Sequence, residues 1–101
     1  MPAYIIARVD VKNPEAFEPY KQPTAASIAQ YGGRFLVQSS RHEVLEGTWN
    51  PNRLVVLEFP SAEAAKRWYD SEEYRAPKAL RLQHAVSSLL LAEGIQPAPA
   101  P

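Results

Sequence analysis

The sequence predicts an α+β fold in which helices cover one face of an antiparallel sheet. Its 101 residues, 46% of them hydrophobic, suit one small domain with a single core. Alternating apolar residues indicate four strands. Apolar residues at helical spacing indicate helices after the first strand and after the third. The resulting order, β-α-β-β-α-β, is that of a ferredoxin-like sandwich.

The first strand and the first helix occupy the first third of the chain. Residues 3–11 are rich in β-branched and aromatic side chains, which favour a strand. Asn13 suits the N-cap and Pro14 the first helical position, so a helix is expected from Pro14 to Tyr31. Pro23 is expected to kink or split this helix, because it lacks a backbone N–H and clashes with the preceding turn. The helical spacing is carried by Phe17, Tyr20, Thr24, Ile28 and Tyr31.

Gly32 and Gly33 separate this helix from the next strand. A phosphate-binding loop needs glycines between a strand and the start of a helix, where free N–H groups point outward. Here the order is reversed. We therefore interpret the pair as a helix end, with Gly32 at the left-handed C′ position. The turn then sets whether Arg34 and Gln38 face the helices.

Two strands and a turn are predicted in the middle of the chain. Residues 34–40 predict the second strand, which is expected to resume over 42–46 after an irregularity at its serine pair. The segment 47–52 contains Gly, Asn and Pro, a composition typical of turns. The third strand is predicted over 53–59.

The last third of the chain predicts two helical segments and a fourth strand. Ser61 is expected to cap a helix over 62–70, which is strongly helix-forming. Ser71 is expected to cap a further short helix, which Pro77 interrupts or restarts. The final strand is predicted over 87–93.

Composition limits the partners and the compartment. One domain is expected over residues 1–94, and the Pro/Ala-rich segment 95–101 is expected to be a disordered tail. Eleven basic residues balance eleven acidic ones, which argues against nucleic acid or an anionic membrane as a partner. The chain has no cysteine, no signal-peptide pattern and no apolar run of the ~18 residues that a membrane span needs. These features favour a cytoplasmic protein.

The strand faces predict a homodimer. Two helices can cover only one face of the sheet, and the other face also carries apolar side chains. A patch of that size normally marks an interface, so two open faces are expected to pack together. The apolar residues left open are predicted to be Tyr4, Ile6, Leu54, Val56, Leu89 and Leu91, or the set opposite to them. Arg8, Glu58 and Gln38 would then lie in or at the mouth of a cavity between two sheets, where the charges need to pair with one another.

Four stretches of sequence together resemble a known family. They are YGGRFLV (31–37), VLEGTWNP (44–51), RLVVLEFPS (53–61) and WYDSEEYR (68–75). In this order they are similar to the family called domain of unknown function 1330, of the dimeric α+β barrel superfamily. The resemblance spans residues 4–94. It implies a ferredoxin-like protomer and a barrel built from two sheets.

The resemblance implies no established activity. The wider superfamily contains cofactor-independent monooxygenases, muconolactone isomerase-like enzymes and stress-responsive proteins. That relation is an analogy of fold, and function has to be argued from the site itself.

His42 and Trp49 are the candidates in the predicted turn region. His42 is one of two histidines and is the best candidate for acid–base catalysis near neutral pH. The alternative is a solvated loop histidine. Trp49 would act either as a lid over a cavity or as a plug that closes one end of the barrel.

The candidate ligand-binding residues are charged or aromatic. Arg34 or Arg8 could clamp a carboxylate, with Glu58 nearby, whereas the alternative is a structural ion pair at the sheet rim or the dimer interface. Tyr20 is one of several aromatic residues that would line a pocket or simply fill the core.

Three functions remain open at this point: a small enzyme acting on an organic molecule, a non-catalytic ligand-binding module, and a structural dimer. With two scattered histidines and no cysteine, neither a metal nor a cofactor is predicted. A Gly-x-Ser-x-Gly motif is absent from the sequence. RNA-recognition domains share the strand order, but they need basic charge and aromatics on the open faces of the first and third strands, and the third offers only Phe59, at its end.

Overall fold

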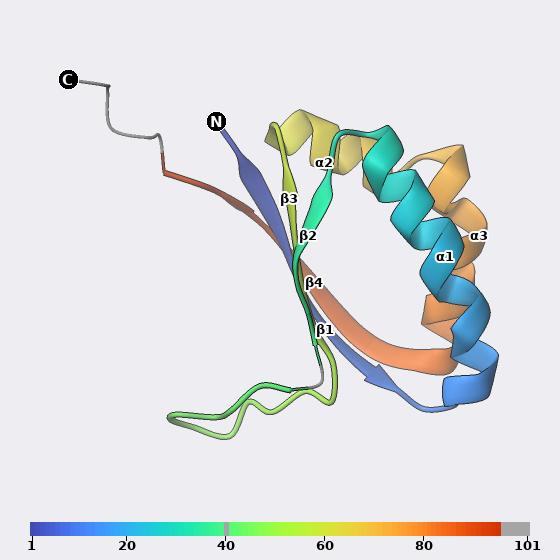
Figure 1. Ribbon diagram of the computed structural model, residues 1–101, viewed down its shortest axis with the longest axis vertical. Helices are drawn as coiled ribbons and strands as arrows, with labels where there is room; N and C mark the ends of the chain where they lie inside the picture. Colours follow the sequence, from blue (N-terminus) through green and yellow to red (C-terminus); the bar gives the residue numbers. More distant parts are fainter. Residues whose placement is uncertain (40, 96–101) are drawn as a thin grey trace.

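The computed structural model describes residues 1–39 and 41–95 and contains the predicted order of elements (Figure 1). The predicted disordered tail therefore lies, apart from Ile95, outside the described residues. The elements are β1 (Ala3–Val11), α1 (Pro14–Gln30), β2 (Arg34–Ser39), β3 (Leu54–Phe59), α2 (Ala62–Tyr69), α3 (Glu72–His84) and β4 (Ala85–Glu93).

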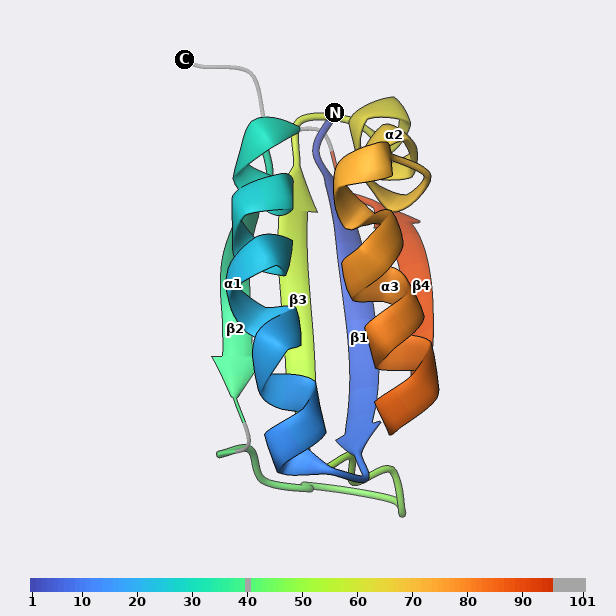
Figure 2. The same cartoon turned by 90° about the vertical axis from the view of Figure 1, so that its right-hand side faces the viewer.

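The four strands form one antiparallel sheet in the order β2-β3-β1-β4, which is the ferredoxin-like topology. All three helices lie on the same side of the sheet (Figure 1). Seen from that side, α1 lies over the β2–β3 half and α3 over the β1–β4 half (Figure 2). The predicted fold class is therefore confirmed.

The core lies between the sheet and the helices. Alternate residues of β1 and β3 point to this side and are buried, as the period of two predicts. They pack against Trp68, Tyr74, Phe17 and Ile28, which are at most 2% exposed. Burying a side chain of this size contributes about 1.5–3 kcal/mol.

The prolines do not interrupt the helices. α1 continues through Pro19 and Pro23, and α3 continues through Pro77. The predicted split at Pro23 and the predicted interruption at Pro77 are therefore wrong, while the alternative of a kink at Pro23 stays a prediction. Each proline removes one backbone hydrogen bond, but packing outweighs this loss. α1 buries side chains on both sides of its prolines, and the Pro77 ring is itself buried.

The predicted continuation of β2 over 42–46 is also wrong. Residues 41–53 form an irregular loop, and β3 begins only at Leu54, opposite Ser39. The segment that follows, 47–52, contains glycine and proline, which disfavour a strand that could pair with 42–46. The loop extends beyond the end of the sheet, on the side away from the helices (Figure 1).

A β-bulge in β2 changes which side chains face the helices. The register shifts between Phe35 and Val37, so that Val37 pairs with Val56 on the open face and Gln38 pairs with Val55 on the helix face. The expectation that Gln38 lies between two sheets is therefore wrong. Arg34 precedes the bulge and lies on the open face.

The helix end at the glycine pair is as predicted. Gly32 has a φ of 80°, and its N–H donates to the Ala29 carbonyl, while the Gly33 N–H donates to the Ile28 carbonyl. Gly33 is required for a different reason. A Cβ there would lie 2.6 Å from the Phe59 ring. The pair therefore ends a helix and allows close packing on the sheet.

None of the three described helices covers the other face of the sheet (Figure 1). Its apolar residues include Tyr4, Ile6, Val37, Leu54, Val56, Val86 and Leu90, with Leu90 66% exposed. Leu89 and Leu91 instead pair with Ala7 and Ile5 on the helix face, which corrects the set predicted for this strand. β4 also begins earlier than predicted, because Ala85 follows α3 directly.

Candidate ligand cavity between the sheet and the helices

A narrow cavity lies inside the protomer, between the sheet and helices α1 and α3. Its walls are mainly apolar and include Ile5, Val9, Phe17, Ile28, Val55 and Leu57. The space left free is about 30 Å³, which is room for about two water molecules.

Three polar side chains form a chain along this cavity. Tyr20 of α1 and Tyr74 of α3 place their hydroxyl oxygens 2.5 Å apart. Arg81 Nε donates to the Tyr74 oxygen at 3.2 Å, and Arg81 Nη1 donates to Ser87 Oγ. Because a guanidinium can only donate, Tyr74 accepts from Arg81, whereas in the bond between the two tyrosines either hydroxyl can be the donor. When Tyr74 donates to Tyr20, the Tyr20 proton is left for another acceptor.

Arg81 is buried without a countercharge in the described part of the chain. It is 2% exposed, and no carboxylate of residues 1–39 and 41–95 lies within ion-pair distance. Burial acts to lower the pKa of Arg81, but the neighbouring Tyr74 and Tyr20 hydroxyls outweigh it, so the pKa is raised. Arg81 is thus a cation in a mainly apolar environment, a costly arrangement.

Tyr20 is a hydrogen-bond donor at neutral pH. Burial and the adjacent Tyr74 raise its pKa far above the ordinary value for tyrosine. One turn further along α1, the buried Thr24 hydroxyl lies close enough to Tyr20 to act against the rise of its pKa, although it makes no hydrogen bond of normal geometry among the described residues. The cavity therefore holds donors that the protein itself does not fully use.

The wall behind Tyr74 is rigid. The ring of Tyr74 stacks on Trp68 with centroids 4.2 Å apart, and Trp68 Nε1 donates to Ser27 Oγ at 3.0 Å. Ser71 caps α3 by accepting from the Tyr74 N–H at 3.1 Å. These contacts fix the Tyr74 hydroxyl in space.

The cavity opens beside the base of the 41–53 loop. Lys21, Gln38 and Arg53 line its outer part, and an open hollow of about 350 Å³ shares Phe17, Lys21 and Arg53 with it. Burial lowers the pKa of Arg53. Because the hollow shares these lining residues with the cavity, we take it as the entrance.

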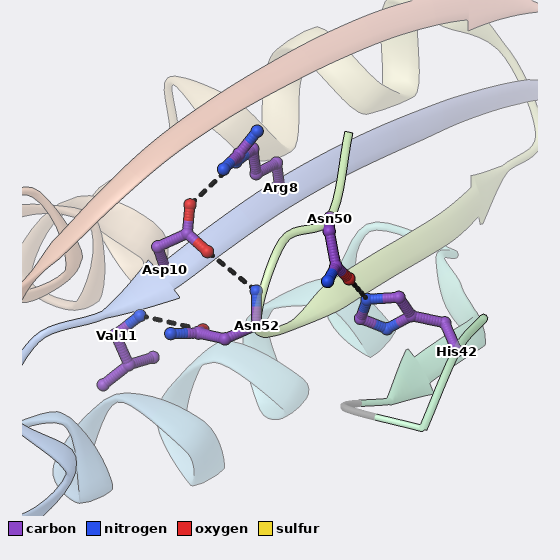
Figure 3. Close-up of polar contacts among 6 residues, drawn as sticks. All are labelled: Arg8, Asp10, Val11, His42, Asn50 and Asn52. Atoms are coloured by element: carbon purple, nitrogen blue, oxygen red, sulfur yellow. Dashed lines mark hydrogen bonds and ion pairs between the residues drawn. The ribbon is translucent and has the colours of Figure 1, made fainter. Parts of the chain in front are cut away.

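Hydrogen bonds attach the end of the loop to β1 (Figure 3). The Asn52 N–H donates to Asp10 Oδ1 at 2.7 Å, and the Val11 N–H donates to Asn52 Oδ1 at 3.2 Å. The bond from Asn52, and then the one from Arg8, lower the pKa of Asp10. These bonds hold Asn52 in place, and therefore also the backbone of the next residue, Arg53, at the entrance.

The residues singled out from the sequence lie in three separate places. Tyr20 lines the cavity. Arg34 and Glu58 form a 2.7 Å ion pair on the open face, while Arg8 pairs with its neighbour Asp10 at 2.7 Å. Within one protomer Arg8 therefore does not pair with Glu58, and their pairing across two sheets stays a prediction.

His42 and Trp49 lie together on the loop. They line a shallow hollow of about 360 Å³ that is open to solvent. His42 Nε2 is 3.2 Å from Asn50 Oδ1 (Figure 3), whereas its Nδ1 is buried with no partner in the described ranges. Trp49 is 53% exposed and does not line the inner cavity.

Sequence reasoning did not single out Arg81 or Thr24. A signal was present, because Tyr74 and Arg81 are seven residues apart and so share one face of a helix. Within the described residues, no group of three or more His, Asp or Glu side chains is arranged to hold a metal ion. No helix there combines the length and apolar character needed to cross a membrane.

The family model of the Domain of unknown function (DUF1330) matches residues 2–95. The chain belongs to this family. No functionally curated protein matches this DUF1330 member significantly in sequence.

Solved structures confirm the fold of this DUF1330 protein. A protein of unknown function from Rhodopseudomonas palustris is 21% identical with a TM-score of 0.77, and the match covers 95% of this chain and 84% of that one. SnoaB, a cofactor-independent oxygenase from Streptomyces nogalater, is 19% identical with a TM-score of 0.65, over 98% of both chains. An antibiotic biosynthesis monooxygenase is 17% identical with a TM-score of 0.57, over 93% of this chain and 99% of that one.

Proposed function

We propose that this protein binds a small organic molecule in the cavity between its sheet and helices and converts it without a cofactor. The observation that carries this proposal is the chain of Tyr20, Tyr74 and Arg81 inside an otherwise apolar cavity. Apolar walls with a few convergent polar groups are typical of small-molecule sites. The fold shared with the oxygenase SnoaB supports this reaction class by analogy.

The polar chain suits a reaction in which negative charge develops on an oxygen atom. Arg81 and the two tyrosines supply fixed donors in a place from which water is largely excluded, where such donors are most effective. The oxygen of an enolate or phenolate formed from the substrate would accept from Tyr20. The polarised Tyr74 hydroxyl would support that bond.

We also propose that the protein acts as a homodimer through its open sheet faces. The uncovered apolar residues on β1, β3 and β4 support this arrangement, since such a patch is unfavourable in water. Arg8, Arg34 and Glu58 lie on these faces, and His42 and Trp49 lie on the loop that extends to the same side. If His42 acts as an acid or base, or if Trp49, Arg8, Arg34 or Glu58 contacts a ligand, that ligand would lie between the two protomers. A chain without cysteine suits the cytoplasm.

A non-catalytic ligand-binding module or a structural dimer is the alternative, and the small free volume of about 30 Å³ favours it. In that case the cavity is nearly filled by its own side chains. Exposed side chains at its mouth, Lys21 and Gln38, would have to move before a ligand enters.

The proposal is tested by a ligand screen followed by turnover. Thermal-shift and native mass-spectrometry screens of small aromatic and aliphatic molecules are expected to find ligands whose binding is weakened by Tyr20→Phe. Oxygen consumption or isomerisation of those ligands is then measured, with His42→Ala as a comparison. Binding without turnover selects the non-catalytic alternative. No binding by any member of a broad library contradicts the ligand site.

A further inference from the structure

We infer that the cavity selects a small organic carboxylate, held by Arg81 and the Tyr20 hydroxyl, with its apolar part against the sheet. This inference rests on the proposed function, because it concerns the same cavity, and it names the substrate class. It follows from the charge and the hydrogen bonding of the cavity.

The charges along the path are almost all positive. Arg53 and Lys21 line the entrance and Arg81 lies within, while none of the described residues that line the cavity is Asp or Glu. The one acid at the entrance is Glu18, which pairs with Lys21 at 3.1 Å and is exposed. A path of this kind attracts anions and repels cations.

The hydrogen-bonding groups are mostly donors. Arg81 donates to Tyr74 and to Ser87, and its guanidinium has five N–H groups. The Tyr20 hydroxyl can donate to a guest when Tyr74 donates to it, and Thr24 adds a second buried hydroxyl beside Tyr20. A carboxylate has two oxygens that only accept, so it matches this set, whereas an ammonium group does not.

A purely structural role for Arg81 is the competing explanation. Arg81 lies in the last turn of α3, where the helix dipole favours a cation, and Ser87 and Tyr74 hold it in place. This explanation accounts for the position of Arg81. It does not account for the cations at the entrance, Lys21 and Arg53.

The test compares matched probes that differ only in charge. Binding of benzoate and benzamide, and of propionate and propionamide, is measured by calorimetry on the full chain. Amide NMR spectra locate the site through the signals of Thr24 and Arg53. We expect the carboxylates to bind about tenfold or more tightly than the amides. Arg81→Met is expected to abolish this preference, and Tyr20→Phe is expected to weaken carboxylate binding by about threefold to tenfold.

Arg81→Lys keeps the charge and serves where the Met variant does not fold. It is expected to retain a weaker preference for the carboxylates, because an ammonium lacks the planar fork of a guanidinium. Equal binding of acids and amides at the cavity overturns the inference and leaves the proposed function intact. A carboxylate preference that survives Arg81→Met also overturns it, since the entrance alone would then be responsible. Failure of every acid, amide and neutral library compound to bind removes the proposed function as well.

Discussion

Tyr20 and Tyr74 are 54 positions apart in the sequence, yet their hydroxyl oxygens lie 2.5 Å from each other. The contact joins α1 to α3 in the middle of the helical layer, and Arg81 extends it to β4. The same three side chains connect the helices to one another and supply the polar groups of the cavity. Their roles in stability and in binding can be separated by substitution.

Tyr74→Phe is expected to destabilise the protein by about 1–3 kcal/mol, because it leaves the buried Arg81 with one acceptor fewer. Urea unfolding measures the change. Tyr69→Phe is the matched control, since Tyr69 is 37% exposed and its hydroxyl makes no hydrogen bond within the described residues. Equal effects of the two substitutions would show that the Arg81–Tyr74 bond contributes nothing to stability.

Leu90→Glu is expected to convert a dimer into a monomer, because Leu90 lies on the open sheet face and is 66% exposed in the protomer. Light scattering at micromolar concentration measures the mass. Leu82→Glu is the control, since Leu82 is 64% exposed but lies on α3. A wild-type protein that is already monomeric would remove the two-sheet arrangement.

Gly33→Ala and Gly47→Ala are expected to destabilise for different reasons. A Cβ at Gly33 would lie 2.6 Å from the Phe59 ring and 2.8 Å from Ile28, an overpacking that costs about 1–3 kcal/mol. Gly47 faces open space, and only its φ of 86° disfavours alanine, by about 1 kcal/mol. The two variants are compared by the midpoints of their urea unfolding curves. A larger effect at Gly47 would contradict the close packing assigned to Gly33.

Asp10 is expected to make stability depend on pH in the acid range. Its pKa in the folded chain lies below the ordinary value of 3.8, because it accepts from the Asn52 N–H and from Arg8. Its contribution is therefore fully present above pH 3.8 and is lost as the pH falls through the lower folded value. Asp10→Asn should flatten this part of the stability curve. If stability falls as steeply at acid pH in Asp10→Asn as in the wild type, the Asp10 contacts are absent in solution.

The elements and their order could be predicted because they depend on local patterns. The alternation in 53–59 and the serine caps at Ser61 and Ser71 are found where expected. The prolines were misread, because their effect depends on tertiary packing, which local propensity does not contain. The β2 bulge was also missed, since an extra residue is visible only once the partner strand is known.

The site was less predictable than the fold. Charged residues on strands drew attention to Arg8, Arg34 and Glu58, which the sheet places on its open face. Arg81 was not singled out from the sequence. In the folded chain α1 brings Tyr20 to Tyr74 of α3. Arg81 donates to the same Tyr74 hydroxyl and so faces the cavity.

The direct passage from α3 into β4 has a structural consequence. Ala85 follows His84 with no loop between the elements, so the helix that carries Arg81 runs straight into the strand that carries Ser87 and Leu90. Ser87 bonds to Arg81 on the inner side of β4, while Leu90 faces outward three residues later. One short continuous segment therefore forms both a wall of the cavity and part of the open sheet face.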